Sequence, residues 1–399
     1  MMKRFLATFT LLVSMGVALI AFLPDEADTM PMFARKYDMS CTSCHAAWPT
    51  LNATGRDFKE NGYNLDRDEE PDIVTSDFLQ WDKGFPIGAH VKARPYDKKD
   101  SANEKLRAIH EVEVFVAGVL YKNVSGWFEL EAEDEDDFEP FIAEATIGYH
   151  LSDAVNLQFI WGPLHDWDPY DTYNGSRRLT RGRPAVIDQR FGGADNDEGL
   201  STRRQMVALY GRPWEMLFYS VGRSGVAKDA EGVNPNNIHG RLAFEFTPDI
   251  MVGLFGLDGE YEAAADSSDK DRDFSRYGVD AQAEFFFSQG PFPGNLRLQG
   301  VYLQAKDDRA TSGQEENGAW YAQVSYAVTS DDRPTWAPLV RFDSYERNDG
   351  TDDFQELTLN LGYYFTQNIK GLVEYWDQLD VANGVEEDSR FTLQLEVAF

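Results

Sequence analysis

The chain has 399 residues, 68 of them acidic and 37 basic, so its formal net charge is −31 at pH 7. Such an acidic surface repels nucleic acid, which excludes that class of partner, and attracts cations such as metal ions or basic proteins. Aromatic residues make up 14% of the chain, Gly occurs 32 times and Cys only twice. This composition is typical of a bacterial β-barrel rather than of a disulfide-rich domain.

The N-terminus has the composition of a secretory signal peptide. Met1-Met2-Lys3-Arg4 is a short basic start, and a largely apolar run follows from Phe5 to Leu23. This pattern predicts a cleaved signal over residues 1–23. The alternative is an uncleaved anchor helix, because the run nearly spans a bilayer core of about 30 Å. Both interpretations send the rest of the chain out of the cytoplasm.

The two cysteines lie in the stretch Cys41-Thr42-Ser43-Cys44-His45, which has the spacing of covalent c-type haem attachment. Two thiols at this spacing reach the two vinyl groups on one edge of a porphyrin, and the adjacent imidazole then reaches the iron from one face. A thioredoxin-like redox pair needs a surrounding βαβ unit, and a zinc site needs two more ligands nearby. The sequence offers neither, so it predicts one covalent haem c held by Cys41, Cys44 and His45.

The sixth ligand of the iron is less strongly indicated. A low-spin electron carrier needs a Met or a second His on the other haem face, whereas an open position suits ligand binding or peroxide chemistry. Met39 is too close to His45 in sequence to reach that face easily, whereas a longer stretch of chain separates Met30 and Met32 from His45. His90 is the nearest downstream His and is our candidate, although each of these side chains also fits ordinary packing.

The haem motif belongs to a short segment, which we place at residues 24–80. From Pro31 to Asp66 the pattern predicts one or two small helices, with Pro49 and Gly62 as breakers. Domains of fewer than about 40 residues seldom hold a core of their own. We therefore expect the haem to lean on the remaining chain, residues 81–399.

Downstream of this segment the hydrophobic period changes to two, which predicts strands. The alternating runs are clearest at 85–94, 111–116, 127–131, 141–149, 277–287, 356–365 and 391–399. We expect about sixteen strands, beginning near Phe85 and ending at Phe399. An even number places both barrel ends on the side of the short turns, which is the periplasmic side in outer-membrane barrels.

Alternation also occurs in soluble sandwiches, and three further features favour a membrane barrel. The strands are about ten residues long, which suits a tilted membrane crossing. Aromatic residues lie at strand ends, as interfacial girdles require: Tyr149, Trp161, Trp320, Tyr363 and Phe365. Short connections (152–153, 212–213, 247–249, 366–368) alternate with long, mostly acidic ones (133–139, 222–237, 258–273, 377–389), and the longest spans 163–200. The predicted fold is an all-β, transmembrane antiparallel barrel in the bacterial outer membrane, with the helical haem segment plugging or capping its lumen.

The alternation also assigns side chains to faces. If Ile87, Ala89 and Val91 face lipid, then His90 and Lys92 face the lumen, where the haem segment can fold back towards them. The same rule sends seven carboxylates inwards: Glu111, Glu113, Glu129, Glu131, Glu144, Asp280 and Glu284. These groups line a wet pore in the simplest interpretation, and a few of them suit a passing cation as oxygen ligands.

A haem-bearing N-terminus followed by a barrel of this size resembles the fused monohaem cytochrome–porin family, the outer-membrane iron oxidases of iron-oxidising bacteria. The matching stretches are Pro31-Met32-Phe33-Ala34-Arg35, Met39-Ser40-Cys41-Thr42-Ser43-Cys44-His45, Pro49-Thr50-Leu51-Asn52, Gly55-Arg56, Phe58-Lys59 and Asn61-Gly62-Tyr63. Residue-level likeness is confined to positions 31–63, and the barrel matches in kind only.

The resemblance implies an electron-transfer protein that takes electrons from extracellular Fe(II) and passes them through the barrel-enclosed haem to a periplasmic carrier, such as a soluble cytochrome c. It implies attachment of haem c at Cys41 and Cys44, with His45 as proximal iron ligand, and outer-sphere electron transfer. The loop 163–200, with His165, Asp166 and Asp168, is a candidate iron contact or a solvated loop folded into the pore mouth. Two other functions stay open: an electron conduit for another donor or acceptor, and a porin with a haem-bearing plug. Hydrolase and transferase motifs are absent from the sequence.

Overall fold

The computed structural model describes residues 32–65, 73–76, 79–82, 87–164, 168–173, 175, 177–189, 198–232, 236–261, 271–309, 313–330 and 333–399. The expected signal peptide (1–23), Met30, His165 and Asp166 lie outside the described residues.

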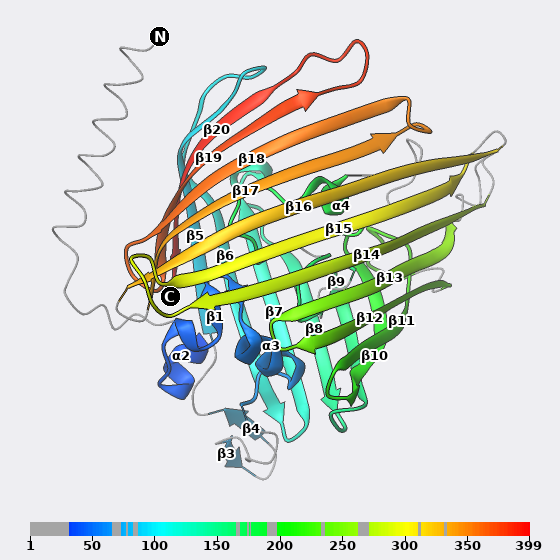
Figure 1. Ribbon diagram of the computed structural model, residues 1–399. Coiled ribbons are helices and arrows are strands. Elements are labelled where there is room, and N and C mark those ends of the chain that lie inside the picture. The colour runs from blue at the N-terminus through cyan, green and yellow to red at the C-terminus, as the bar shows by residue number, and fades with distance from the viewer. Residues whose placement is uncertain are drawn as a thin grey trace.

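Sixteen strands close into one antiparallel barrel in which each strand pairs with its neighbours along the chain (Figure 1). They are β5 (Ile87–Lys99), β6 (Lys105–Tyr121), β7 (Val124–Glu133), β8 (Phe141–His150), β9 (Asn156–Gly162), β10 (Arg204–Trp214), β11 (Leu217–Ser224), β12 (Asn237–Thr247), β13 (Ile250–Tyr261), β14 (Arg272–Phe287), β15 (Gly294–Asp308), β16 (Gln314–Ser330), β17 (Arg333–Arg347), β18 (Asp352–Tyr364), β19 (Ile369–Asp380) and β20 (Ser389–Ala398). The last strand, β20, pairs with the first, β5, in a register that sets Val397 opposite Val91. The prediction of an antiparallel barrel of about sixteen strands is confirmed.

The connections alternate in length as expected, with one local error. Arg212 and Pro213 do not form a turn, because both lie inside β10, and the turn itself is Glu215–Met216. The pairing of β10 with β11 shifts register between Gly211 and Trp214. Pro is accommodated there because an irregular point in a ladder does not need the missing N–H.

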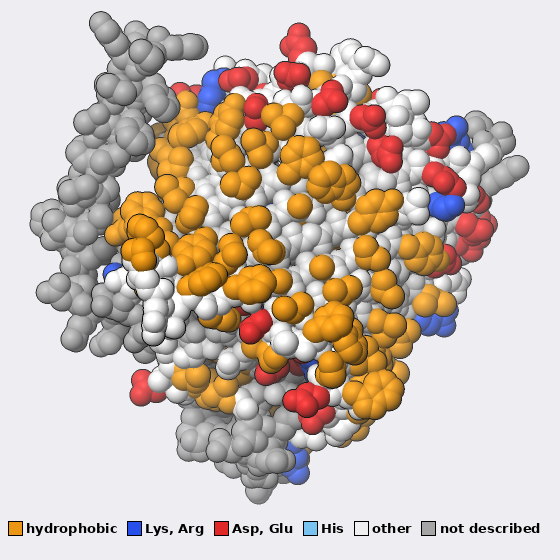
Figure 2. Space-filling view, in the orientation of Figure 1, with side chains coloured by type: hydrophobic (Ala, Val, Ile, Leu, Met, Phe, Trp, Pro, Cys, Tyr) orange, Lys and Arg blue, Asp and Glu red, His pale blue; other side chains and the backbone are white. Residues whose placement is uncertain are grey.

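Side chains on the barrel alternate between an apolar outside and a polar inside. On β14, Val279 is 45% exposed whereas the adjacent Asp280 is 2% exposed, and on β18 Leu359 and Asn360 differ in the same way. Figure 2 shows apolar side chains spread over the strands that face the viewer, with Asp and Glu gathered along the edge of the long connections. This arrangement is what a lipid environment requires of a barrel wall.

The other elements belong to the N-terminal segment and to the loops. The N-terminal segment contains the helix α2 (Met32–Tyr37), the 3-10 helix η1 (Cys41–Ser43), the paired strands β1 (His45–Ala47) and β2 (Thr50–Leu51), and the helix α3 (Ala53–Glu60). The hairpin β3 (Ile73–Ser76) and β4 (Leu79–Asp82) follows, and the loops carry η2 (Asp134–Asp136) and α4 (Ala185–Asp188). None of the helices in the described part of the chain is long and apolar enough to cross a membrane.

The long loop between β9 and β10 folds into the lumen. Its Asp168 is fully buried, 2.9 Å from the guanidinium of Arg241 on β12, and its Thr172 donates a hydrogen bond to Asp280 at 2.8 Å. Further along the loop, the backbone N–H of Ala185 at the start of α4 donates to Asp343 on β17 at 2.8 Å. These buried bonds hold the loop against the inner wall.

The N-terminal segment docks against the inner wall at the rim of the short turns, near the C-terminus of the chain (Figure 1). The backbone N–H of Cys41 donates to Gln367, in the short turn after β18, at 2.7 Å, and the Tyr364 hydroxyl donates to the carbonyl oxygen of Trp48 at 2.7 Å. The two residues that hold α3, Arg56 and Glu60, are both buried. The short segment thus obtains its core from the barrel.

Candidate cofactor site

The cysteine motif folds as one tight turn. Cys41 begins η1, and the N–H of Cys44 returns to the carbonyl oxygen of Cys41 at 3.2 Å. Both thiols are free; Cys41 is buried and Cys44 is partly buried. Burial raises the pKa of Cys41 to about 11 and also raises the pKa of Cys44. The two sulfur atoms are therefore presented as neutral thiols from one turn of chain.

His45 is held in one orientation by the backbone that follows it. Its Nδ1 lies 3.1 Å from the carbonyl oxygen of Pro49, which accepts the ring N–H in the neutral tautomer. With the proton on Nδ1, the lone pair is on Nε2. Metal-ligating histidines commonly have this arrangement, in which one ring nitrogen binds the metal and the other donates to a carbonyl oxygen. Burial lowers the pKa of His45 to about 4, so the imidazole is neutral and able to act as a ligand near neutral pH.

Helix α3 supports this turn from behind. Its N-cap, Asn52, accepts a hydrogen bond from the N–H of Gly55 at 3.0 Å and donates through Nδ2 to the carbonyl oxygens of Thr42 and Ser43, each at 3.2 Å. Gly55 packs so closely that an added Cβ would lie 2.1 Å from the carbonyl oxygen of Cys44. The Asn52 side chain and the bare Gly55 together fix the position of the cysteine motif.

The motif faces a cavity of about 400 Å³ enclosed between the N-terminal segment, the barrel wall and the β9–β10 loop. This volume lies within the range of about 300–1,000 Å³ that is usual for small-molecule and cofactor sites. The N-terminal segment contributes the thiols, the imidazole and an apolar, aromatic surface to it: Cys41, Cys44, His45, Trp48, Phe58 and Tyr63. A cofactor attached at the cysteines would therefore be shielded from bulk water.

His90 points into this same cavity, as the facing pattern predicted. Its Nδ1 lies 2.6 Å from Glu113, its Nε2 lies 3.2 Å from Glu396, and its ring packs edge-on to Trp48 at 5.0 Å. Both ring nitrogens thus face carboxylates, and a metal at Nε2 would have to replace Glu396. Met32 and Met39 line the cavity too, so the identity of the sixth ligand stays a prediction.

The expected lumenal carboxylates do face inwards, and two of them, Glu111 and Glu131, form a cluster with Glu133. Ligand oxygens of Glu111, Glu131 and Glu133, on β6 and β7, lie within 4.8 Å of one another and border the cavity. The ammonium group of Lys92 lies 2.5 Å from Glu111 and neutralises part of this charge. This cluster forms an acidic part of the cavity wall.

The β9–β10 loop folds into the pore, as one of its two interpretations expected, and the burial of Asp168 excludes that residue from the other. Asp168 is not a surface contact for iron, because it is fully buried beside Arg241. The loop instead supplies a basic wall to the cavity, made of Arg177, Arg178, Arg181, Arg183 and Arg203, which Arg94 extends from β5. The signal was present in the sequence, since four arginines within seven positions (177–183) are unusual in a chain with only 37 basic residues.

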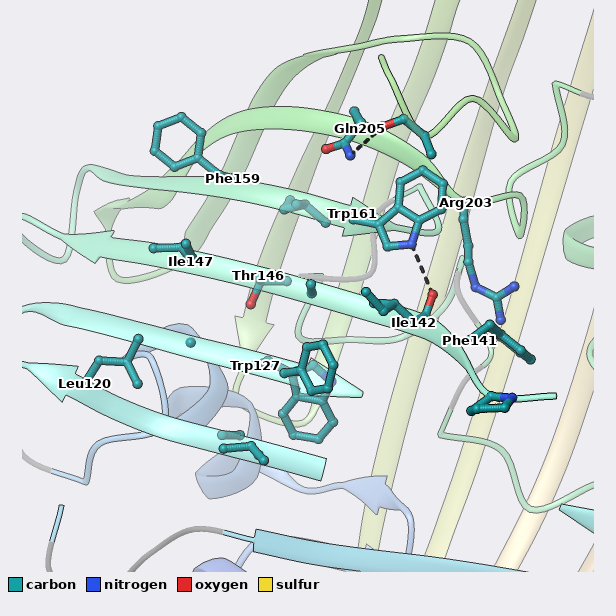
Figure 3. Close-up of a pocket in the computed structure, with 18 of the residues that line it drawn as sticks. Leu120, Trp127, Phe141, Ile142, Thr146, Ile147, Phe159, Trp161, Arg203 and Gln205 are labelled. Carbon is teal, nitrogen blue, oxygen red and sulfur yellow. Dashed lines mark hydrogen bonds between the residues drawn. The ribbon is translucent and has the colours of Figure 1, made fainter. Parts of the chain in front are cut away.

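A second hollow, of about 1590 Å³, lies on the outer face of β6 to β9 (Figure 3). Leu120, Ile147 and Phe159 border it and are each about half exposed. At its upper edge the indole N–H of Trp161 donates to the carbonyl oxygen of Ile142 at 3.1 Å. The apolar lining suits lipid acyl chains and places this hollow apart from the cysteine cavity.

No protein-family model matches the chain, and no curated protein matches it. Solved structures share its fold. An anion-selective porin from Comamonas acidovorans has a TM-score of 0.57 at 12% identity, covering 78% of this chain and 98% of that one. OmpF of Salmonella typhi, in complex with daunomycin, has a TM-score of 0.57 at 13% identity, covering 82% and 100%. The outer membrane channel DcaP of Acinetobacter baumannii has a TM-score of 0.53 at 12% identity, covering 78% and 95%. The chain is thus a porin-like β-barrel.

Proposed function

We propose that this protein is an electron conduit of the bacterial outer membrane that oxidises extracellular Fe(II) through a single covalent haem c and delivers the electrons to a periplasmic carrier. The observation that carries the proposal is the position of the Cys41–His45 motif, which borders a partly open cavity inside a porin-like barrel. The resemblance of residues 31–63 to fused cytochrome–porins supports the choice of Fe(II) as donor.

The side chains at the site fit a haem c. Cys41 and Cys44 supply two free thiols, and His45 offers Nε2 while Pro49 holds Nδ1. When bound there, the haem supplies one-electron redox chemistry. The chain itself fixes the tautomer of the ligand and excludes water by means of Trp48 and other aromatic side chains.

Charge and position support an inward flow of electrons. Acidic side chains gather at the long-loop edge of the barrel, which is the extracellular edge in outer-membrane barrels. Such an edge concentrates Fe(II) at the outer mouth of the barrel. The bond between Cys41 and Gln367 places the cysteine motif near the rim of the short turns. A soluble periplasmic cytochrome c has access to this rim.

The direct test is anaerobic stopped-flow absorbance of the oxidised protein in outer-membrane vesicles mixed with Fe(II). The haem α-band should appear rapidly and at a rate that falls as ionic strength rises from 0.01 to 0.15 M, since the Debye length shrinks from about 30 Å to about 8 Å. A neutral hydroquinone, as matched reductant, should show little salt dependence. A haem that stays oxidised with Fe(II) but is reduced by dithionite would contradict Fe(II) oxidation. The protein would then be a conduit for another donor or acceptor, because the fold and the haem do not determine the direction of electron flow.

The porin-like fold favours a second candidate, a solute channel in which the N-terminal segment is a plug. This function predicts solute leakage through the purified protein in liposomes. Leakage by the wild type at the rate of an open porin, without haem reduction by Fe(II), would support the channel and contradict the conduit.

Replacing Gly55 with Ala should reduce haem attachment. The new Cβ would meet the Cys44 carbonyl oxygen at 2.1 Å, so α3 or the cysteine turn has to move, and overpacking of this kind costs about 1–3 kcal/mol. The measurement is covalently bound haem per barrel after separation in denaturant. Gly362→Ala is the matched control, because its nearest neighbour atom is 3.6 Å away. Equal haem content in the two variants would contradict the supporting role of Gly55.

A further inference from the structure

Three of the cations that line the cavity lack a carboxylate partner. Within the part of the chain that the structure describes, no salt bridge involves Arg94, Arg178 or Arg183, although all three border the cavity. Arg94, on β5, is 5% exposed, and its Nε donates to Gln394 at 2.6 Å. Arg178 donates only to the backbone oxygens of Gly175 and Arg181.

Other cations on the same wall are paired. Arg177 lies 3.1 Å from Asp171, Arg181 lies 3.0 Å from Asp97, and Arg203 lies 3.4 Å from Glu131. Arg183 has a buried Nε with no hydrogen-bond partner among the described residues, as Arg177 and Arg181 do, but unlike them it forms no ion pair there. The unpaired guanidinium groups also oppose one another, since burial and the neighbouring Arg178 both lower the pKa of Arg183.

Arg94 is buried and Arg178 and Arg183 are partly buried, so each guanidinium gives up some of its hydration without a carboxylate at ion-pair distance, which is costly. A protein keeps such groups when an anion binds between them, and the planar guanidinium suits a carboxylate, which it can hold by two parallel hydrogen bonds. The geometry therefore calls for a ligand that brings more than one carboxylate into the cavity.

The cysteine motif identifies a source for those carboxylates. A haem joined through its vinyl groups to Cys41 and Cys44 carries two propionates on the opposite edge of the porphyrin. The thiols come from η1, whereas the unpaired arginines come from β5 and from the β9–β10 loop, so one cavity offers both kinds of contact from different elements. Arg177 of the same loop borders this cavity together with His45.

We propose that Arg94, Arg178 and Arg183 are the binding site for the haem propionates, so that the inward-folded β9–β10 loop is a part of the cofactor site. This inference rests on the proposed haem attachment. On this proposal the loop sets the redox equilibrium of the haem. Each guanidinium beside the propionates favours the reduced haem, because its positive charge stabilises the added electron.

The test uses the full-length protein, purified with its haem, and the variant Arg183→Gln, alone and combined with Arg178→Gln. The ratio of oxidised to reduced haem at a fixed potential should rise about tenfold per arginine, which is about 59 mV for one electron. The resonance Raman bending mode of the propionates, which follows their hydrogen bonding, should shift as well. Arg183→Lys should retain most of the redox equilibrium and still shift the Raman mode, because it keeps the charge and loses the planar fork.

Arg309→Gln is the control, since this exposed residue pairs with Asp349 far from the motif in sequence and outside the cavity lining. An unchanged Raman mode and redox equilibrium in the double variant, with haem attached, would overturn the inference and leave the proposed function standing. A wild-type protein without covalent haem would overturn both. A purely structural role for the loop predicts lost haem in Arg183→Gln and in Arg183→Lys alike, which also contradicts the proposal.

Discussion

Replacing both Cys41 and Cys44 with Ala should remove all covalently bound haem from the protein, while the barrel still assembles. The two thiols are the only cysteines in the chain, so no other thioether can form. The barrel should survive because its sixteen strands pair with one another and not with the motif. The measurement is haem retained by the denatured chain, together with heat-modifiable migration as the readout of the folded barrel.

The single variants refine this prediction. Cys41→Ala or Cys44→Ala should each keep one thioether and show a displaced α-band, because one vinyl group then stays unsaturated. Ser43→Ala is the matched control inside the same turn, since its hydroxyl contacts only the Ser40 hydroxyl, at 3.3 Å, on the exposed side. Covalent haem in the double variant, or a redox-active disulfide in a wild type without haem, would contradict the assignment.

The local structure favours haem over the other uses of a Cys-x-x-Cys pair. The motif lies beside a two-stranded antiparallel sheet, β1 and β2, and not in a βαβ unit of the thioredoxin type. Zinc would need two more ligands beside Cys41 and Cys44. Among the described residues, the sole group of three or more potential metal-ligating side chains is the glutamate cluster of β6 and β7.

The barrel could be predicted from sequence because its physics is local. A period of two fixes which side chains face lipid, and the same alternation placed His90 and Lys92 in the lumen correctly. The ends of strands were predicted less well, as the Arg212-Pro213 pair shows. The low strand propensity of Pro predicts a turn there, but the irregular register lets the strand continue through it. An inward-folded loop was expected, but which of its side chains line the cavity could not be deduced, since the path of the loop depends on buried partners such as Asp280 and Asp343.

The docking of the N-terminal segment is the least predictable feature, and it can be tested by removing two side chains of α3. Arg56 lies 3.3 Å from Glu284 on β14, which is 228 positions away, and Glu60 lies 2.7 Å from Arg212 on β10. No pattern within 31–63 specifies these partners. Their separation in sequence makes them contacts of the folded barrel alone.

The double variant Arg56→Ala with Glu60→Ala should release the segment and raise ionic conductance in planar bilayers well above that of the wild type. The wall keeps its own pairs, since Glu284 stays 3.4 Å from Arg297 and Arg212 stays 2.8 Å from Glu245. Because both wall residues keep a partner, each lost pair costs about 1.5 kcal/mol, and about 3 kcal/mol in total changes the ratio of docked to undocked segment by on the order of 10². Thr54→Ala, an exposed position on the same helix, should leave the conductance unchanged. If the double variant conducts no more than the wild type, the segment either stays docked by other contacts or does not obstruct the lumen, and the role of these two ion pairs as its anchors would have to be abandoned.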